Sequence, residues 1–204
     1  MRFRHQLALA LFVSSFSNLA LASSGGITSG SLAGSGCNNC HSGGSAPTVT
    51  ITGPASLSNG AEGTYTLSFP TIGSQLAGGL NVKASSGIMA VIAGEGTQLV
   101  SNEITHTGRK NAVSGTVSFQ FKVKAPVTGS ASITLTGWGN AVNSNFNFNG
   151  DRASSATKSI TVSCPDSDSD GAAALSCGGT DCNDNDGAIK PGISYDLEFA
   201  DQFG

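Results

Sequence analysis

Charge is scarce in this chain of 204 residues. Asp, Glu, Lys and Arg make up 11 % of it, the formal net charge is −3, and the ten Lys and Arg residues form no cluster. A nucleic-acid interface needs a basic patch, so the composition argues against that class of function. Long apolar runs are also missing, because no stretch approaches the roughly 20 apolar residues of a membrane-spanning helix.

The residues of common catalytic sites are equally sparse. The chain contains three histidines and two methionines. It shows no activated Ser or Cys arrangement, no phosphate-binding loop and no spare histidine to act as a base. We therefore expect that the protein is not an enzyme.

Residues 1–22 have the pattern of a secretory signal. Arg2 and Arg4 provide a positive start, an apolar run follows, and Ala20 and Ala22 form a small-x-small cleavage site. The apolar run is too short for a transmembrane helix. The sequence thus predicts a protein that is secreted, and extracellular or held at the cell surface.

Apolar and polar residues alternate from residue 47 onward, with the period of two that is typical of β-strands. Clusters of Gly and Pro interrupt the alternating runs, and no run keeps a helical period for ten residues. We expect an all-β fold over residues 47–163, an immunoglobulin-like antiparallel β-sandwich of about seven strands. Residues 23–46 are rich in Gly and Ser and have the composition of a flexible linker.

One motif inside that linker has a specific chemistry. Cys37, Cys40 and His41 form the Cys-x-x-Cys-His pattern of covalent c-type haem attachment. Each thiol can add to one vinyl group of the porphyrin, and the histidine that follows is then directed at the iron as its proximal ligand. The motif therefore predicts covalent haem c.

Three other interpretations of the motif remain open. A redox-active dithiol usually lies in a βαβ unit, which does not follow here. Half of a zinc site would need a second Cys/His pair at a suitable spacing. The third reading is a structural disulfide between Cys37 and Cys40.

An electron-transfer haem usually has a second axial ligand, His or Met. After removal of the signal, the remaining candidates are His106 and Met89. We favour His106, because it is the only other histidine of the mature chain, and Met89 lies in an apolar run that suggests a core position. Trp138, between two glycines, is either a core residue or a surface for stacking on the porphyrin.

The order of these motifs resembles a known group of domains. Gly36 to His41, Ala46 to Val49, residues 104–107, residues 137–143 and Gly150-Asp151 resemble bacterial exported domains called choice-of-anchor V domains, which are distantly related to eukaryotic reeler domains. The resemblance covers about residues 35–163. It implies a β-sandwich in a secreted or surface-attached protein.

An acidic segment follows at residues 164–192. Asp166, Asp168 and Asp170 alternate before a glycine, a spacing that can wrap oxygen ligands around Ca²⁺. It is not an EF-hand, because Cys177 stands at the twelfth position of the loop. A second acidic cluster completes the predicted metal ligands, which are Asp166, Asp168, Asp170, Asp181, Asn183, Asn185 and Asp186.

The whole acidic segment resembles thrombospondin type 3 repeats and the metal-binding repeats of bacterial surface proteins, some of them described as copper-binding. Oxygen ligands favour calcium over copper. Three cysteines lie in or beside this segment, so we expect one disulfide and one free thiol. Cys177–Cys182 and Cys164–Cys182 are equally open as pairs.

Residues 193–204 resume strand alternation with an apolar face. Such a strand needs a partner, and it could add to a sheet edge of another copy to form a filament. The leading hypothesis is an exported mono-haem cytochrome that carries electrons to a redox partner or to neighbouring haem subunits. The alternative is a calcium-stabilised surface adhesion or structural module without haem.

Overall fold

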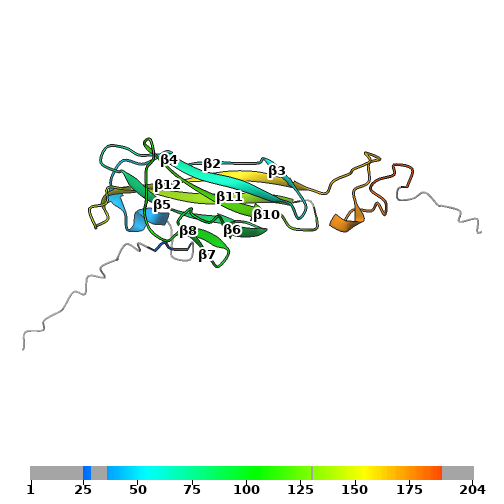
Figure 1. Ribbon diagram of the computed structural model, residues 1–204, viewed down its shortest axis with the longest axis horizontal. Helices are drawn as coiled ribbons and strands as arrows, with labels where there is room; N and C mark the ends of the chain where they lie inside the picture. Colours follow the sequence, from blue (N-terminus) through cyan, green and yellow to red (C-terminus); the bar gives the residue numbers. More distant parts are fainter. Residues whose placement is uncertain (1–24, 29–35, 130, 190–204) are drawn as a thin grey trace, which may run out of the picture.

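The computed structural model describes residues 25–28, 36–129 and 131–189 (Figure 1). The predicted signal at 1–22 and the predicted strand at 193–204 lie outside these residues. The described part is a sandwich of two β-sheets, which confirms the predicted all-β, immunoglobulin-like class. Among the described residues, no helix is both long and apolar enough to span a membrane.

The smaller sheet has four strands. Their order is β2 (Thr50–Thr52), β4 (Glu62–Pro70), β10 (Thr116–Lys124) and β6 (Ile88–Val91).

The larger sheet has eight strands. Its main path is β1 (Ser42–Gly43), β12 (Asn149–Ser163), β11 (Ala131–Val142), β5 (Ala77–Ala84), β8 (Glu103–His106) and β7 (Thr97–Val100). In addition, β3 (Ser56–Ser58) pairs with β12 and β9 (Lys110–Asn111) pairs with β5.

The core lies between the sheets and follows the predicted alternation. In β4 and β10 every second residue is buried, and the register places Phe119 opposite Leu67 and Phe121 opposite Tyr65. The Tyr65 and Phe121 rings stack at 6.1 Å. Burial of each large apolar side chain contributes roughly 1.5–3 kcal/mol relative to exposure, so this pattern sets which face of each strand points inward.

The described residues form twelve strands, where about seven were expected. The additional strands have two to four residues, too few for a detectable alternation, and lie at sheet edges. Two of them, β1 and β3, pair parallel with β12 in an otherwise antiparallel sheet. These short pairings bring distant parts of the chain onto the long strand β12.

Strand β5 is unusual because six consecutive residues, 77–82, are buried. A strand of a two-sheet sandwich normally buries one face only. Here a Cβ at Gly78 would meet core residue Phe69, whereas Gly79 faces His106, and the Asn81 side chain bonds to Ile27 O at 3.0 Å. The outer face of the larger sheet is therefore covered at this point, and the candidate site lies there.

The acidic segment leaves the end of β12, at the opposite end of the sandwich from the N-terminal residues (Figure 1). A disulfide joins Cys164 to Cys177, and Cys182 is free and exposed. One disulfide and one leftover thiol were expected, but the pairing is neither of the two that the sequence suggested. The short helix η3 (Leu175–Cys177) brings Cys177 back toward the start of the segment.

Candidate functional site

The Cys-x-x-Cys-His motif forms a tight turn. Helix η2 (Gly36–Asn39) is a single 3₁₀ turn, and the N–H groups of Cys40 and His41 both donate to Cys37 O, at 3.3 and 3.1 Å. Gly36 has a φ of 60° and lies against the Trp138 ring, where a Cβ would collide with it. This close approach fixes the start of the motif on strand β11.

The residues between the two cysteines attach the motif to strand β12. The Asn38 side chain donates to Ala153 O at 3.0 Å and accepts from Ala153 N–H at 2.9 Å. Ser42–Gly43 then pairs with β12. The composition of residues 23–46 indicated a flexible linker, yet the described part from Gly36 onward makes specific bonds. An isolated Asn among Gly and Ser gives no sign of its distant partner.

A cavity of about 490 Å³ lies beside the motif, within the 300–1,000 Å³ range of sites that hold a small molecule or cofactor. Both cysteines of the motif line it, as do His41 and His106. Its principal lining residues are Cys37, Cys40, His41, Gly79, His106, Arg109, Asn140, Phe146 and Asp151. The buried Asn140 Oδ1 has no hydrogen-bond partner among the described residues.

His41 is held in one tautomer. Its Nδ1 lies 2.9 Å from Asp151 Oδ2. A carboxylate only accepts hydrogen bonds, so Nδ1 carries the proton, and Nε2 of the neutral ring keeps its lone pair. A metal-binding histidine typically has its other ring nitrogen held in this way.

His106 fills a gap at the edge of strand β5. Strand β8 pairs with residues 81–83 of β5 and β9 pairs with residues 77 and 78. Between them, His106 Nδ1 lies 3.0 Å from Leu80 O and 3.1 Å from Leu80 N. In the tautomer whose Nδ1–H donates to Leu80 O, the Nε2 atom is free to bind a metal.

Burial affects two of the titratable groups at the cavity. It lowers the pKa of His106, against a hydrogen bond with Leu80 that raises it, so the neutral form, which can ligate a metal, is favoured. It also raises the pKa of Cys37 to about 11. Cys37 and Cys40 are free thiols, and a raised pKa is the opposite of what an active redox dithiol requires.

The alternative distal ligand does not reach the cavity. Met89 is 1 % exposed and packs in the core. Trp138 is only partly buried and contacts Gly36; it does not line the cavity. The sequence analysis missed Asp151, Arg109 and Phe146, because single charged or aromatic residues in loops and at strand ends form no motif.

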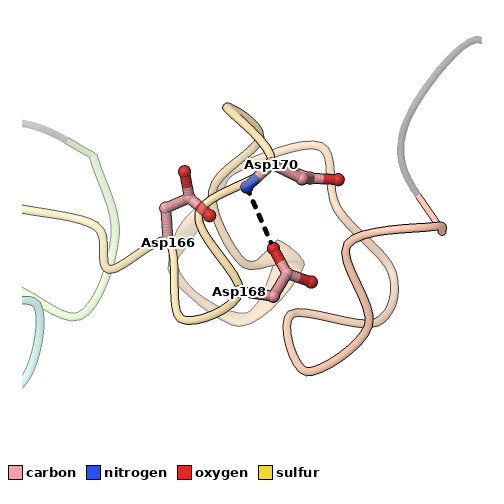
Figure 2. Close-up of side chains that lie close together, drawn as sticks. All are labelled: Asp166, Asp168 and Asp170. Carbon is pink, nitrogen blue, oxygen red and sulfur yellow. Dashed lines mark hydrogen bonds between the residues drawn. The ribbon is translucent and has the colours of Figure 1, made fainter.

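The acidic segment brings three predicted metal ligands together. Asp166, Asp168 and Asp170 have carboxylate oxygens within 4.8 Å of one another (Figure 2). Two oxygens that each lie about 2.4 Å from one Ca²⁺ can be up to about 4.8 Å apart, so the spacing suits that ion.

Each of these carboxylates uses one oxygen to shape the loop, and its other oxygen is buried with no hydrogen-bond partner among the described residues. The bonded oxygens accept from Gly171, Asp170 and Ala172 N–H groups. Asp181, only 1 % exposed, repeats the pattern, with Oδ1 accepting from Asn183 N–H and Oδ2 buried and unpaired among the described residues.

The charge of Asp181 acts on the cluster. Desolvation raises the pKa of Asp168, and the charges of Asp170, Asp181 and Asp166 raise it further. Among the described residues, Asp181 is not one of the carboxylates whose oxygens lie within 4.8 Å of one another, so its link to the cluster is electrostatic. The other predicted ligands make turn bonds, with Asn183 O accepting from Asn185 and Asp186 N–H groups and Asp186 Oδ1 accepting from Ala188 N–H.

Comparison with known proteins does not identify a family for this chain. No protein-family model matches the chain, and no curated protein matches it. Among solved structures, a CARDB domain of a Pyrococcus furiosus protein, determined in complex with di-metal ions, is 16 % identical with a TM-score of 0.29. The match covers 60 % of this chain and 94 % of that domain.

Proposed function

We propose that this chain is an exported mono-haem c-type cytochrome that carries electrons outside the cytoplasm. The observation that supports this most directly is the convergence of Cys37, Cys40, His41 and His106 on one cavity. Cys37 and Cys40 would attach the haem covalently, and His41 and His106 would be its axial ligands. Haem supplies a reversible one-electron centre in such a protein.

The role of each residue follows from its surroundings. The turn at Cys37 keeps both thiols and His41 at the same wall of the cavity, and Asn38 holds that turn on β12. His106 approaches from the edge of β5. With both axial positions taken by the chain, we propose a carrier of electrons instead of an enzyme.

The test is the chemistry of the mature protein. Protein produced with the c-type maturation machinery should carry the mass of one haem covalently and give a c-type pyridine haemochrome spectrum. Cys37→Ala and Cys40→Ala should each reduce stable attachment. Cys182→Ser, which changes an exposed free thiol in the acidic segment, is the matched control and should leave attachment unchanged. Wild-type protein without haem would overturn the proposal.

We further propose that residues 166–181 bind calcium and order the acidic segment. In the part of the chain that the structure describes, four Asp residues each keep one buried oxygen without a hydrogen-bond partner, which supports this. Calorimetric titration of chelator-treated protein should show Ca²⁺ binding, and absence of binding would reject it. If calcium binds and haem does not, the chain is better described as a calcium-stabilised surface module.

A filament is a third element of the proposal. Strand β6 is an edge of the smaller sheet, and its exposed side chains include Ile88 (63 %) and Val91 (42 %). Among the described residues no further strand pairs with this edge, although Met89 N–H donates to Asn102 Oδ1 at 2.9 Å, and an apolar sheet edge can accept an added strand. We propose that residues 193–199 of another copy add there, and deletion of 193–204 should then reduce the oligomer size. The resemblance to choice-of-anchor V domains supports the export of such a subunit.

A further inference from the structure

The two histidines at the cavity differ in what holds their Nδ1 atoms. His41 Nδ1–H donates to a carboxylate, Asp151 Oδ2, at 2.9 Å. Among the described residues, the partners of His106 Nδ1 are the peptide groups of Leu80, at 3.0 and 3.1 Å. A carboxylate acceptor withdraws the Nδ1 proton more strongly than a neutral carbonyl does, and so makes Nε2 of the same ring a stronger donor.

Asp151 is a buried carboxylic acid side chain that has two hydrogen-bond donors as partners. It is 3 % exposed, and its second oxygen accepts from Asn143 N–H at 2.8 Å. Its backbone lies in β12, where it pairs with Gly43, and Asp151 O accepts from Gly44 N–H at 3.2 Å. Within the described residues, His41 is the only side chain that hydrogen-bonds to its carboxylate.

Burying a carboxylate in its charged form lowers the stability of a fold. A buried carboxylate without a fully charged partner destabilises a fold unless its hydrogen bonds compensate for the lost hydration. The bond to Asn143 N–H alone could be made by an Asn side chain, which has no charge to bury. The remaining reason for a carboxylate is its contact with His41.

We propose that Asp151 is a positioning residue that orients His41, strengthens its donation to a bound metal and thereby lowers the reduction potential of the centre. The inference rests on the proposed haem function. A stronger donor stabilises the oxidised, more positively charged state, and hydrogen bonding to axial ligands is one of the ways in which proteins set haem potentials. His106, with peptide partners only, is the weaker ligand of the two.

The test is redox titration of the Asp151→Asn holoprotein. The amide oxygen of Asn can accept from only one of the two donors, His41 Nδ1–H or Asn143 N–H, and it carries no charge. We expect the haem to stay covalently attached and the midpoint potential to rise. The oxidised-to-reduced ratio at a fixed ambient potential should fall at least tenfold, which corresponds to 59 mV for one electron.

Glu62→Gln is the matched control, because it removes the same charge from an exposed side chain of β4. A potential in Asp151→Asn equal to that of Glu62→Gln would overturn the inference while leaving the cytochrome proposal intact. Wild-type protein without haem would overturn the cytochrome proposal instead.

A second measurement avoids any loss of folding in the variant. In the reduced wild-type holoprotein, the Nδ1–H proton of each axial histidine can be observed by NMR. We expect the His41 proton to resonate downfield of the His106 proton, because its acceptor is charged. Equal chemical shifts would contradict the inference.

Discussion

Gly79 lies directly against the imidazole ring of His106. A Cβ built on Gly79 would stand 2.5 Å from His106 Cε1, 2.7 Å from Nδ1 and 2.9 Å from Nε2, distances that real Cβ atoms essentially never show. The absence of a side chain at this position therefore allows the ring to lie over β5 and fill the gap beside Leu80. Gly79 determines whether His106 can face the cavity.

The first prediction concerns this contact. In Gly79→Ala the added methyl group should displace His106, while Cys37, Cys40 and His41 are untouched. We expect covalent haem at the wild-type level, but at least a tenfold loss of the low-spin population, because tenfold corresponds to only about 1.4 kcal/mol of strain. Absorption and electron paramagnetic resonance spectra measure this loss.

Gly25→Ala is the control for Gly79→Ala, because a Cβ at Gly25 meets nothing within 4 Å and its φ is not in the left-handed region. It should keep the wild-type spectrum. A low-spin Gly79→Ala protein would mean that His106 is not the distal ligand.

A second prediction concerns the attachment of the motif turn. Asn38→Ala removes both hydrogen bonds to Ala153, each worth roughly 0.5–1.5 kcal/mol, so we expect a loss of about 1–3 kcal/mol in the free energy of unfolding. Asn38→Asp keeps an acceptor for Ala153 N–H but loses the donor to Ala153 O. Its free energy of unfolding should therefore lie between those of the wild type and Asn38→Ala. Urea unfolding of the haem-free proteins measures the free energy of unfolding of both variants. If Asn38→Ala has the same free energy of unfolding as the wild type, Asn38 does not hold the turn on β12.

The fold and half of the site could be predicted from local patterns. The alternation around Tyr65 and Phe119 predicted the core faces, because burial of one sheet face imposes a period of two. The motif at Cys37 and His41 could be recognised because covalent chemistry constrains its spacing. His106 was predicted by elimination, since few residues can bind haem iron axially, and the structure places it at the same cavity as His41.

The other residues of the site could not be predicted, because their positions depend on contacts between residues far apart in the chain. Asp151 is 110 residues from His41, and Asn38 is 115 from Ala153, so neither pair forms a sequence pattern. The gap in β5 that admits His106 arises from where β8 and β9 pair. The Cys164–Cys177 disulfide depends on how η3 turns back, which cysteine spacing alone cannot determine.

The third prediction is that calcium stabilises the acidic segment. At a concentration one hundred times its dissociation constant, a ligand that binds only the folded state adds about 2.7 kcal/mol. Chelation should therefore lower the melting temperature of the segment. Asp181→Asn should abolish most of this calcium dependence, because the amide oxygen can still accept from Asn183 N–H but the charge is lost.

Asp184→Asn tests whether that loss is specific. Asp184 is an exposed carboxylate whose two oxygens bond to Ser167, at 3.0 Å to its N–H and at 2.5 Å to its hydroxyl. This variant should lower the stability of the segment equally with and without calcium. Equal calcium responses of Asp181→Asn and the wild type would remove Asp181 from the site.

Glu95 protects an open sheet edge. Strand β6 pairs with only the last four residues of β10, so it does not reach Gln120. The Gln120 N–H instead donates to Glu95 at 3.0 Å, and Lys110 Nζ also donates to Glu95, at 2.7 Å. Burial by itself raises the pKa of Glu95, but the bonds from Lys110 and Gln120 and the Lys110 charge lower it overall. A carboxylate here occupies a position where another strand could otherwise pair.

The fourth prediction follows from that lowered pKa. Glu95→Gln should cost about 1 kcal/mol of unfolding free energy at neutral pH, because a charged acceptor is lost. A carboxyl with a lowered folded-state pKa stabilises the fold above its unfolded value of 4.5, and the contribution disappears as the pH falls through the folded pKa. The difference between wild type and Glu95→Gln should therefore shrink below pH 4.5. Glu62→Gln is the control, because it breaks a more exposed pair with Lys122 and should change stability little at any pH. If the difference in unfolding free energy between the wild type and Glu95→Gln does not change with pH, the charge of Glu95 is not its cause.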